Sequence, residues 1–449
     1  MRQFGRFRRN ARLYLISNVL SGVTTGIFLV LYNLYIVSLG YGPDFIGVVL
    51  FVATIGAGIA IFPAGICVDR FSGKSILIWS SVLIGVAGIG QILFRQPLSL
   101  LISGFVAGVG AAFQLVVNAP FLTANSTPEE RPHLFSVNIV LGLATIVVGK
   151  ILGGALPIWF RGTAWLMAPL PPWLALLLAN QPAPRAYQFA LLFAGIIAGP
   201  SFIPLFFMSN DHPRTPPANV GAEADTIMNS NEITRPLRLH LQQLRKIPPR
   251  VIIASPIFLL TLVQVLIGAG AGLFVPYANL FFVQHLGTSS AFFGLIDGGT
   301  TTLTALMTLA APFLAVRIGR VNSIVLTQLA SIPLLVALGL TPLLPLVALF
   351  YLSRQPLMDM TMGILQVFSM EEAPRHYRGL ANSSYQAGFQ VANAITASLG
   401  GFIIVQFGYP PLFIGAAICY LLAIATLWGR FGRKYGSVQD KNARADRAD

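Results

Sequence analysis

Four ionisable residues lie inside long apolar stretches, where a charge is costly. They are Lys150, Asp297, Arg354 and Asp359. An ionised side chain at the centre of a bilayer costs about 2.5–3.5 kcal/mol on insertion scales, so such residues face protein or a water-filled path. We expect Lys150 and Arg354 to be cations that face a substrate.

We expect Asp297 or Asp359 to take up a proton or to pair with these cations, because burial favours the neutral form of a carboxylate. The alternative is an internal salt-bridge network that only holds helices together. Arg354 and Asp359 are five positions apart and do not share a helical face, so pairs between different helices are favoured.

A second polar set consists of eight amides and one tyrosine in the same kind of apolar sequence. Its members are Tyr32, Asn33, Gln114, Asn118, Gln264, Asn279, Gln386, Gln390 and Asn393. The last three continue a polar stripe at helical spacing, which in lipid must face protein or water. The mixture suits an amphipathic or aromatic organic solute. Each amide taken alone is also explained as a hydrogen bond between helices, worth about 0.6 kcal/mol on average.

The composition identifies the kind of protein that must position these residues. Of 449 residues, 55% are hydrophobic and 10% are charged, and the net charge is +14. Soluble domains carry roughly 25% charged residues. A water-soluble enzyme and a nucleic-acid-binding protein are therefore excluded in spite of the basic charge, and the chain is predicted to be an all-α polytopic membrane protein.

Twelve stretches are long and apolar enough to span a bilayer. They are 13–38, 43–68, 74–94, 97–122, 134–159, 187–208, 252–284, 290–316, 321–341, 343–370, 379–406 and 409–429. Nearly all Lys and Arg residues then fall on the side of the N-terminus, which predicts cytoplasmic termini in a plasma membrane.

The predicted organisation is two six-helix bundles joined by a linker. The bundles cover 1–208 and 251–429, the cytoplasmic linker 209–250 and a cytoplasmic tail 430–449. The second part of the linker has leucines on one helical face, which suits either the inner membrane surface or a solvated turn.

The two bundles are an internal repeat. At a shift of 247 residues Arg70 matches Arg317, and at a shift of 246 Asn33 matches Asn279. Each copy has an even number of spans, so both copies have the same orientation in the membrane.

A loop after the second span carries a recognisable motif. It reads Gly65, three residues, Asp69–Arg70, and then Gly73–Lys74, with Ser72 where a glycine is usual. This loop resembles the signature loop of the major facilitator superfamily. The second copy keeps Arg317 and Arg320 of the motif but has Val316 in place of the aspartate.

The resemblance implies a central cavity lined by spans one, four, seven and ten, and a gate motif that locks the cytoplasmic side in the outward-open state. The gate residues would be Gly65, Asp69, Arg70, Lys74, Arg317 and Arg320. Gly65 would allow close helix contact. The alternative is an ordinary loop of positive charges at the inner surface.

These features predict a secondary transporter that moves a small organic solute by alternating access, with drug-like efflux as the expected direction. The family's export and antiport patterns are imperfect, because Gly104 stands where arginine is expected and no proline follows Gly154. Uptake or facilitated diffusion of a small metabolite is the near alternative. A non-transporting receptor or scaffold is the alternative from another class.

No catalytic or metal-binding constellation and no phosphate-binding loop stands out, so an enzyme is not expected. The expected partners are a small-molecule substrate and membrane lipids, with no nucleic acid. The chain is expected to be a monomer. No cofactor is expected, and a proton is the candidate coupling ion.

Overall fold

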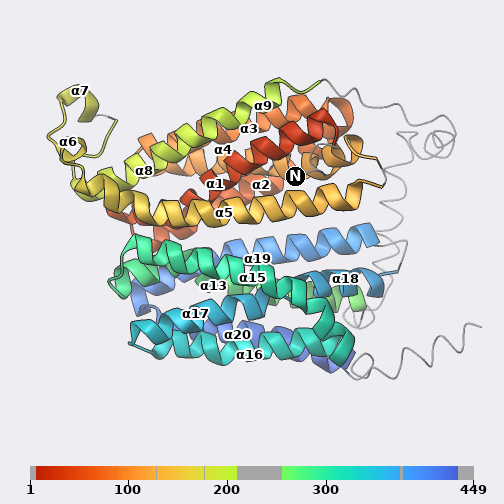
Figure 1. Ribbon diagram of the computed structural model, residues 1–449. Helices are drawn as coiled ribbons and strands as arrows, with labels where there is room; N and C mark the ends of the chain where they lie inside the picture. Colours follow the sequence, from red (N-terminus) through yellow and green to blue (C-terminus); the bar gives the residue numbers. More distant parts are fainter. Residues whose placement is uncertain (1–6, 128, 176, 210–254, 375–377, 433–449) are drawn as a thin grey trace, which may run out of the picture.

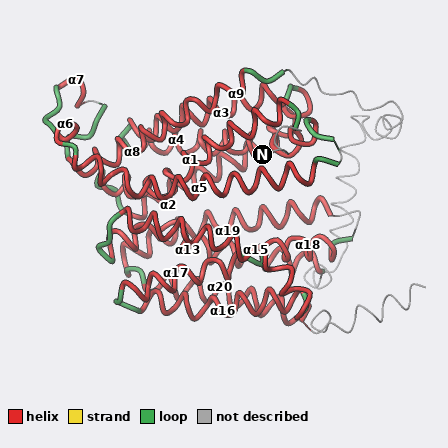
Figure 2. Tube along the Cα trace, in the orientation of Figure 1, coloured by secondary structure: helices red, strands yellow, loops and turns green. Residues whose placement is uncertain are grey.

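The computed structural model describes residues 7–127, 129–175, 177–209, 255–374 and 378–432. Within these ranges every regular element is a helix and none is a strand (Figure 2). The predicted linker and most of the predicted tail lie outside the described residues, as does the leucine-bearing segment of the linker.

The N-terminal half begins four of its long helices with proline or a serine cap. Pro43, Pro97 and Pro182 occupy first helical positions, where a missing N–H leaves no backbone bond unmade, and Ser72 accepts from the backbone N–H of Ser75. The elements are α1 (Arg9–Ser38), α2 (Pro43–Arg70), α3 (Gly73–Leu93), α4 (Pro97–Ala124), α5 (Arg131–Gly162), α6 (Ala164–Met167), α7 (Pro172–Ala175), α8 (Pro182–Ala198), the 3-10 turn Gly199–Ser201 and α9 (Phe202–Phe206).

The C-terminal half contains more interruptions. Its elements are α13 (Pro256–Phe274), the 3-10 turn Val275–Tyr277, α14 (Ala278–Leu280), the π-helical turn Phe281–His285, α15 (Ser290–Ile318), α16 (Arg320–Leu340), α17 (Leu344–Asp359), α18 (Met362–Glu372), α19 (Arg378–Phe407), α20 (Pro410–Leu427) and the π-helical turn Trp428–Gly432. Figure 1 shows the two halves as separate groups, and α5 and α2 of the first pack against α15 and α19 of the second, respectively.

Eleven of the described helices are long and apolar enough to cross a membrane. The predicted span 343–370 is the exception, because it is divided into α17 and α18 at Met360–Thr361. Each piece is shorter than a full span, and α17 carries both Arg354 and Asp359. The predicted all-α, two-bundle architecture is confirmed, with the tenth crossing broken beside its charges.

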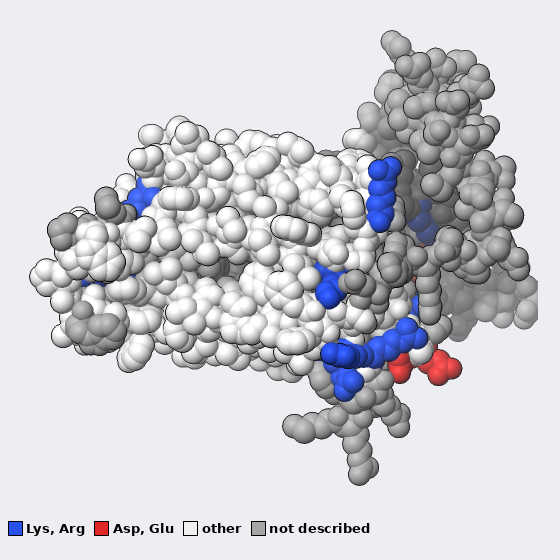
Figure 3. Space-filling model, turned by 90° about the horizontal axis from the view of Figure 1, so that it is seen from above, with Lys and Arg blue, Asp and Glu red and all other residues white. Residues whose placement is uncertain are grey.

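The outer surface of the helices is apolar. Phe62 and Phe313 are 83% and 75% exposed, as expected for side chains that lipid covers. Figure 3 shows Lys and Arg near the two ends of the visible face, and Asp and Glu at one of these ends, with a broad uncharged band between the ends. The chain is thus an integral membrane protein.

Candidate transport site and the seams between the halves

The two halves touch along two seams, which we call the α5–α15 seam and the α2–α19 seam. At each seam a glycine lies against a backbone carbonyl of the other half. A Cβ added to Gly154 would lie 2.5 Å from the Ser290 oxygen, and one added to Gly401 would lie 2.2 Å from the Pro43 oxygen. The Ser290 hydroxyl also donates to the Gly154 carbonyl at 2.8 Å. Only glycine permits backbones to approach this closely.

A reciprocal pair of amides joins the halves between these seams. Asn33 Nδ2 donates to the Pro276 carbonyl at 2.6 Å, and Asn279 Nδ2 donates to the Val30 carbonyl at 3.0 Å. Each acceptor stands three residues before the other asparagine, so the repeat of the sequence is reproduced in the contacts. We call this pair the asparagine clasp.

The seam glycines and the clasp lie toward the same end of the molecule. This is the end where α1 finishes and α2 begins, at the left in Figure 1, and we call it the distal end and the opposite one the proximal end. The two halves are therefore pressed together at the distal end.

The first two predicted charges form an ion pair across the α5–α15 seam. Lys150 Nζ lies 2.8 Å from Asp297 Oδ2, and the two side chains are only 12% and 14% exposed. Lys150 also donates to Thr301 Oγ1 at 2.9 Å. The Tyr351 hydroxyl donates to Asp297 Oδ1 at 2.9 Å, so both carboxylate oxygens have partners.

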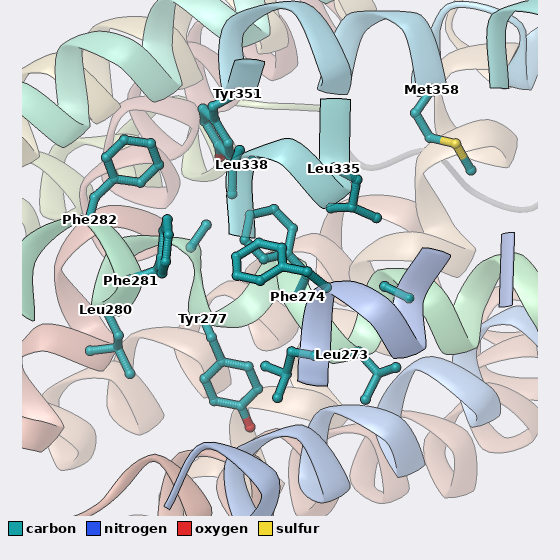
Figure 4. Close-up of a cluster of buried hydrophobic side chains, with 14 of the residues drawn as sticks. Leu273, Phe274, Tyr277, Leu280, Phe281, Phe282, Leu335, Leu338, Tyr351 and Met358 are labelled. Carbon is teal, nitrogen blue, oxygen red and sulfur yellow. The ribbon is translucent and has the colours of Figure 1, made fainter. Parts of the chain in front are cut away.

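The other two charges lie on α17. Arg354 is fully buried, and its guanidinium carbon lies 5.7 Å and 5.3 Å from the ring centroids of Phe274 and Tyr420. Figure 4 shows Phe274 and Tyr351 in this buried cluster of the C-terminal half. Arg354 Nη1 donates to the Gln355 side-chain oxygen, and Gln355 Nε2 donates to Asp359 Oδ2 at 2.6 Å.

This bridge explains how two charges five positions apart interact within one helix. Their side chains do not meet on one face, as the spacing predicts, but Gln355 reaches both. Arg354 Nε and Nη2 have no hydrogen-bond partner among the described residues. The structure thus gives Lys150 an ionic partner and gives Arg354 a neutral amide and two aromatic rings.

Four of the predicted amides hydrogen-bond to other helices. Asn33 and Asn279 form the clasp, Asn393 donates to the Gly268 carbonyl at 3.4 Å, and Gln114 donates to Ser81 at 3.1 Å. For these side chains the interhelical explanation describes the observed contacts.

The remaining members of the polar set are not engaged in this way. Gln386 and Gln390 are exposed on α19, and Gln264 is half-buried on α13. The Tyr32 hydroxyl and Asn118 Oδ1 are buried without a hydrogen-bond partner in the described structure.

The predicted gate residues make their contacts inside their own half. Lys74 Nζ donates to the Met208 carbonyl at 2.7 Å, and Arg320 forms an ion pair with Glu371. Arg70 and Arg317 are exposed.

Two further gate residues differ from the expectation or fall outside it. A Cβ on Gly65 would have no atom within 4 Å, so the expected close helix contact is not formed in this distal-closed arrangement. The side chain of Asp69 lies outside the described part of the chain.

Sequence reasoning missed the neutral residues that connect the charges, Tyr351, Gln355 and Thr301. Their spacing is a usable signal, because Tyr351 and Gln355 stand beside Arg354 within one turn of helix, and Thr301 stands one turn after Asp297. The aromatic partners of Arg354 come from two other helices and leave no local signal. Within the described ranges no group of three or more His, Cys, Asp and Glu side chains could hold a metal ion.

Comparison with solved structures supports the fold. A bacterial homologue of the human lysosomal transporter Spinster, in an inward-facing and occupied conformation, has a TM-score of 0.70 at 13% identity, over 94% of this chain and 96% of that one. A bacterial homologue of the iron transporter ferroportin in an inward-facing state has a TM-score of 0.68 at 19% identity, over 94% and 98%. The nucleoside transporter NupG has a TM-score of 0.66 at 15% identity, over 94% and 98%.

Comparison of the sequence adds the family. No curated protein sequence matches this chain. The sequence model of the Major Facilitator Superfamily matches residues 14–377 and 260–448, which together cover both repeats and the broken tenth crossing. This match agrees with the duplicated bundles, the distal seams and the polar groups between them. The chain belongs to the Major Facilitator Superfamily.

Proposed function

We propose that this protein is a secondary transporter that moves a small organic solute across the plasma membrane by alternating access. The observation that carries the proposal is the asparagine clasp with its two flanking seams, which press the two repeated halves together toward the distal end. Rocking the halves about such a contact would open the distal end and close the proximal one. The concentration of Lys and Arg toward the termini supports a cytoplasmic proximal end.

The exposed amides of α19 support a watery path from the proximal end. Gln386 and Gln390 are exposed near the middle of a membrane-crossing helix. Amides are unfavourable against hydrocarbon, so these two side chains would face water between the halves. In this arrangement the solute would enter or leave from the cytoplasm.

The unpartnered groups support an organic solute with an aromatic or amphipathic body. Tyr32 offers a buried hydroxyl beside the ring of Phe28, which is stacked on it at 6.1 Å, and Asn118 offers a buried carbonyl oxygen. Binding at such a place satisfies polar atoms that otherwise cost free energy. Export of a drug-like solute is the direction that we propose, with import as the competing outcome of the flux assay.

The buried carboxylates support proton coupling. Asp297 and Asp359 lie close to Lys150 and Arg354, so gain of a proton by either acid changes which charges are compensated. The gate residues Arg70, Lys74, Arg317 and Arg320 would then join the halves at the proximal end once the distal end has opened. The segment 209–250 would connect the two bundles during this motion.

The test is flux measured in proteoliposomes. Purified protein is first screened for organic compounds that raise its Tm. Compounds that stabilise it are then followed across the membrane with an imposed pH gradient of either sign and with none. Directional, gradient-driven flux supports a coupled transporter and shows the direction. Stabilisation by a ligand without flux under any gradient would instead indicate a receptor.

A further inference from the structure

We infer that Arg354 is the replacement counter-ion of Asp297. In the distal-closed state Asp297 is paired with Lys150, and when the distal end opens the unpartnered edge of the Arg354 guanidinium takes its place. This inference depends on the proposed alternating access, but its principal test does not require transport.

The first step is that distal opening must break the present pair. Lys150 belongs to α5 and Asp297 to α15, so the contact joins the two halves. Tyr351 belongs to the same half as Asp297 and keeps its hydrogen bond when the halves separate. Asp297 would then be a carboxylate with a neutral hydroxyl as its remaining partner, which is strongly unfavourable for a poorly exposed charge.

The second step is that Arg354 has an unused binding edge of the right kind. A guanidinium offers five N–H donors, and Nε and Nη2 point along the same edge of its plane. These are the two nitrogens without a partner, whereas Nη1 is bonded to Gln355. That edge matches the two oxygens of a carboxylate, and such paired hydrogen bonds are among the strongest that proteins form.

The third step is that Arg354 is close to Asp297 in the fold. Tyr351 lies three residues before Arg354 on α17, which places both on nearly the same helical face, and the Tyr351 hydroxyl is bonded to Asp297. The exchange would then need reorientation of the Arg354 and Asp297 side chains, while α15 and α17 stay packed against each other.

Two other occupants of this edge are chemically reasonable, an oxyanion of the solute and, on the Asp297 side, a proton. The Asp297 carboxylate is favoured over a solute because Arg354 has no exposed surface in the distal-closed state. Asp297 is in addition already hydrogen-bonded to Tyr351, which lies on the same helix as Arg354. Both alternatives are distinguishable outcomes of the experiment.

The experiment is a cycle of variants in which Lys150→Met removes the cation that is paired with Asp297, as distal opening would. Tm is measured on the full chain in detergent for K150M, R354Q, the double variant and each of these with D297N. We expect the loss of Tm in K150M/R354Q to exceed the sum of the single losses by about 4 °C or more. Adding D297N should abolish this excess, because a neutral side chain needs no counter-ion.

Controls separate this role from general packing. R354K keeps the positive charge and should recover part of the coupling, whereas R161Q removes an exposed arginine on α5 and should show none with K150M. If R354Q alone fails to fold, K150M/R354K is used instead, and its excess loss of Tm should be smaller but present, because a lysine keeps the charge and cannot form the paired hydrogen bonds. Additive losses in K150M/R354Q would overturn the inference.

The two alternatives have their own signatures, and either would also overturn it. A proton in place of Arg354 predicts that acidification restores the Tm of K150M whether or not Arg354 is present. A solute oxyanion predicts no coupling to Asp297 but loss, in R354Q, of the stabilisation by acidic compounds seen in the wild type. Failure of the flux assay with an intact coupling would reject the proposed transport and leave the pairing of Arg354 established.

Discussion

The α5–α15 seam and the α2–α19 seam have the same backbone packing and different chemistry. A Cβ on Gly294 would lie 2.4 Å from the Lys150 carbonyl oxygen, and one on Gly47 would lie 2.9 Å from that of Ala397. At the repeat shift of 247 residues, Gly294 corresponds to Gly47 and Lys150 to Ala397. The duplication therefore preserved the close approach of the helices and kept the cation in one copy alone.

The ionic partner of Lys150 is likewise present in only one copy of the repeat. Asp297 corresponds to Leu50 in the first copy, so the α2–α19 seam has an apolar residue where the α5–α15 seam has an acid. Beside Gly47 at the α2–α19 seam, the Tyr277 hydroxyl donates to the Ala397 carbonyl, an uncharged bond that lies within the C-terminal half. Both seams thus take part in closing the distal end, but only the α5–α15 seam can make this closure depend on charge.

The largest effect is expected from a side chain placed between the backbones. Gly47→Val and Gly294→Val each add atoms where a Cβ already overlaps a neighbouring backbone, so each should disfavour distal closure by about 3 kcal/mol. Distances between spin labels at Leu98 and Leu343, both exposed at distal helix ends on opposite halves, would measure the opening.

Gly142→Val is the matched control, because a Cβ there meets no atom within 4 Å and the label distances should stay as in the wild type. Equal opening by G47V and G294V supports equivalent seams. Opening by only one of them would show that a single seam closes the distal end.

The charged seam can be converted into a copy of the uncharged one. Asp297→Leu alone leaves Lys150 poorly exposed and without a counter-ion, and we expect a loss of about 2 kcal/mol in stability. K150A/D297L, which installs the residue types of the α2–α19 seam, should recover most of that loss. Thermal unfolding of the two variants measures this recovery.

The same double variant tests coupling by flux. If the charge on this seam couples a proton to transport, K150A/D297L should still move solute down its gradient but should no longer respond to a pH gradient. Unchanged pH-driven flux in K150A/D297L would show that Asp359 or another group carries the proton.

The smallest effect is expected from the asparagine clasp. Asn33→Ala and Asn279→Ala each remove one hydrogen bond to a carbonyl of the other half, and each should destabilise distal closure by about 1 kcal/mol. The same spin-label distances should shift by equal small amounts in both variants. Markedly unequal shifts would argue that the twofold relation of the contacts has no energetic counterpart.

Much of the architecture follows from local patterns in the sequence. The length of each apolar stretch predicted the membrane helices, and the repeat predicted two equivalent halves. Both features can be read along the chain without knowing which helices touch. The tenth crossing was predicted as continuous but is broken after Asp359. Its apolar length did not reveal the break, since that length is preserved across both pieces.

The candidate site was predicted less completely. The sequence alone determined that Lys150, Asp297, Arg354 and Asp359 are intramembrane charges, since burial cost depends only on residue type and span. It did not determine the partners, because those are set by which helix faces meet.

Only the tertiary structure decided that Lys150 meets Thr301, 151 positions away, and that Asn33 reaches the Pro276 carbonyl, 243 positions away. Contacts at such separations depend on the packing of the two halves at the distal end, where glycine brings backbones together. Local spacing fixes which side chains share a helical face, whereas the rotation and approach of neighbouring helices fix what those side chains touch.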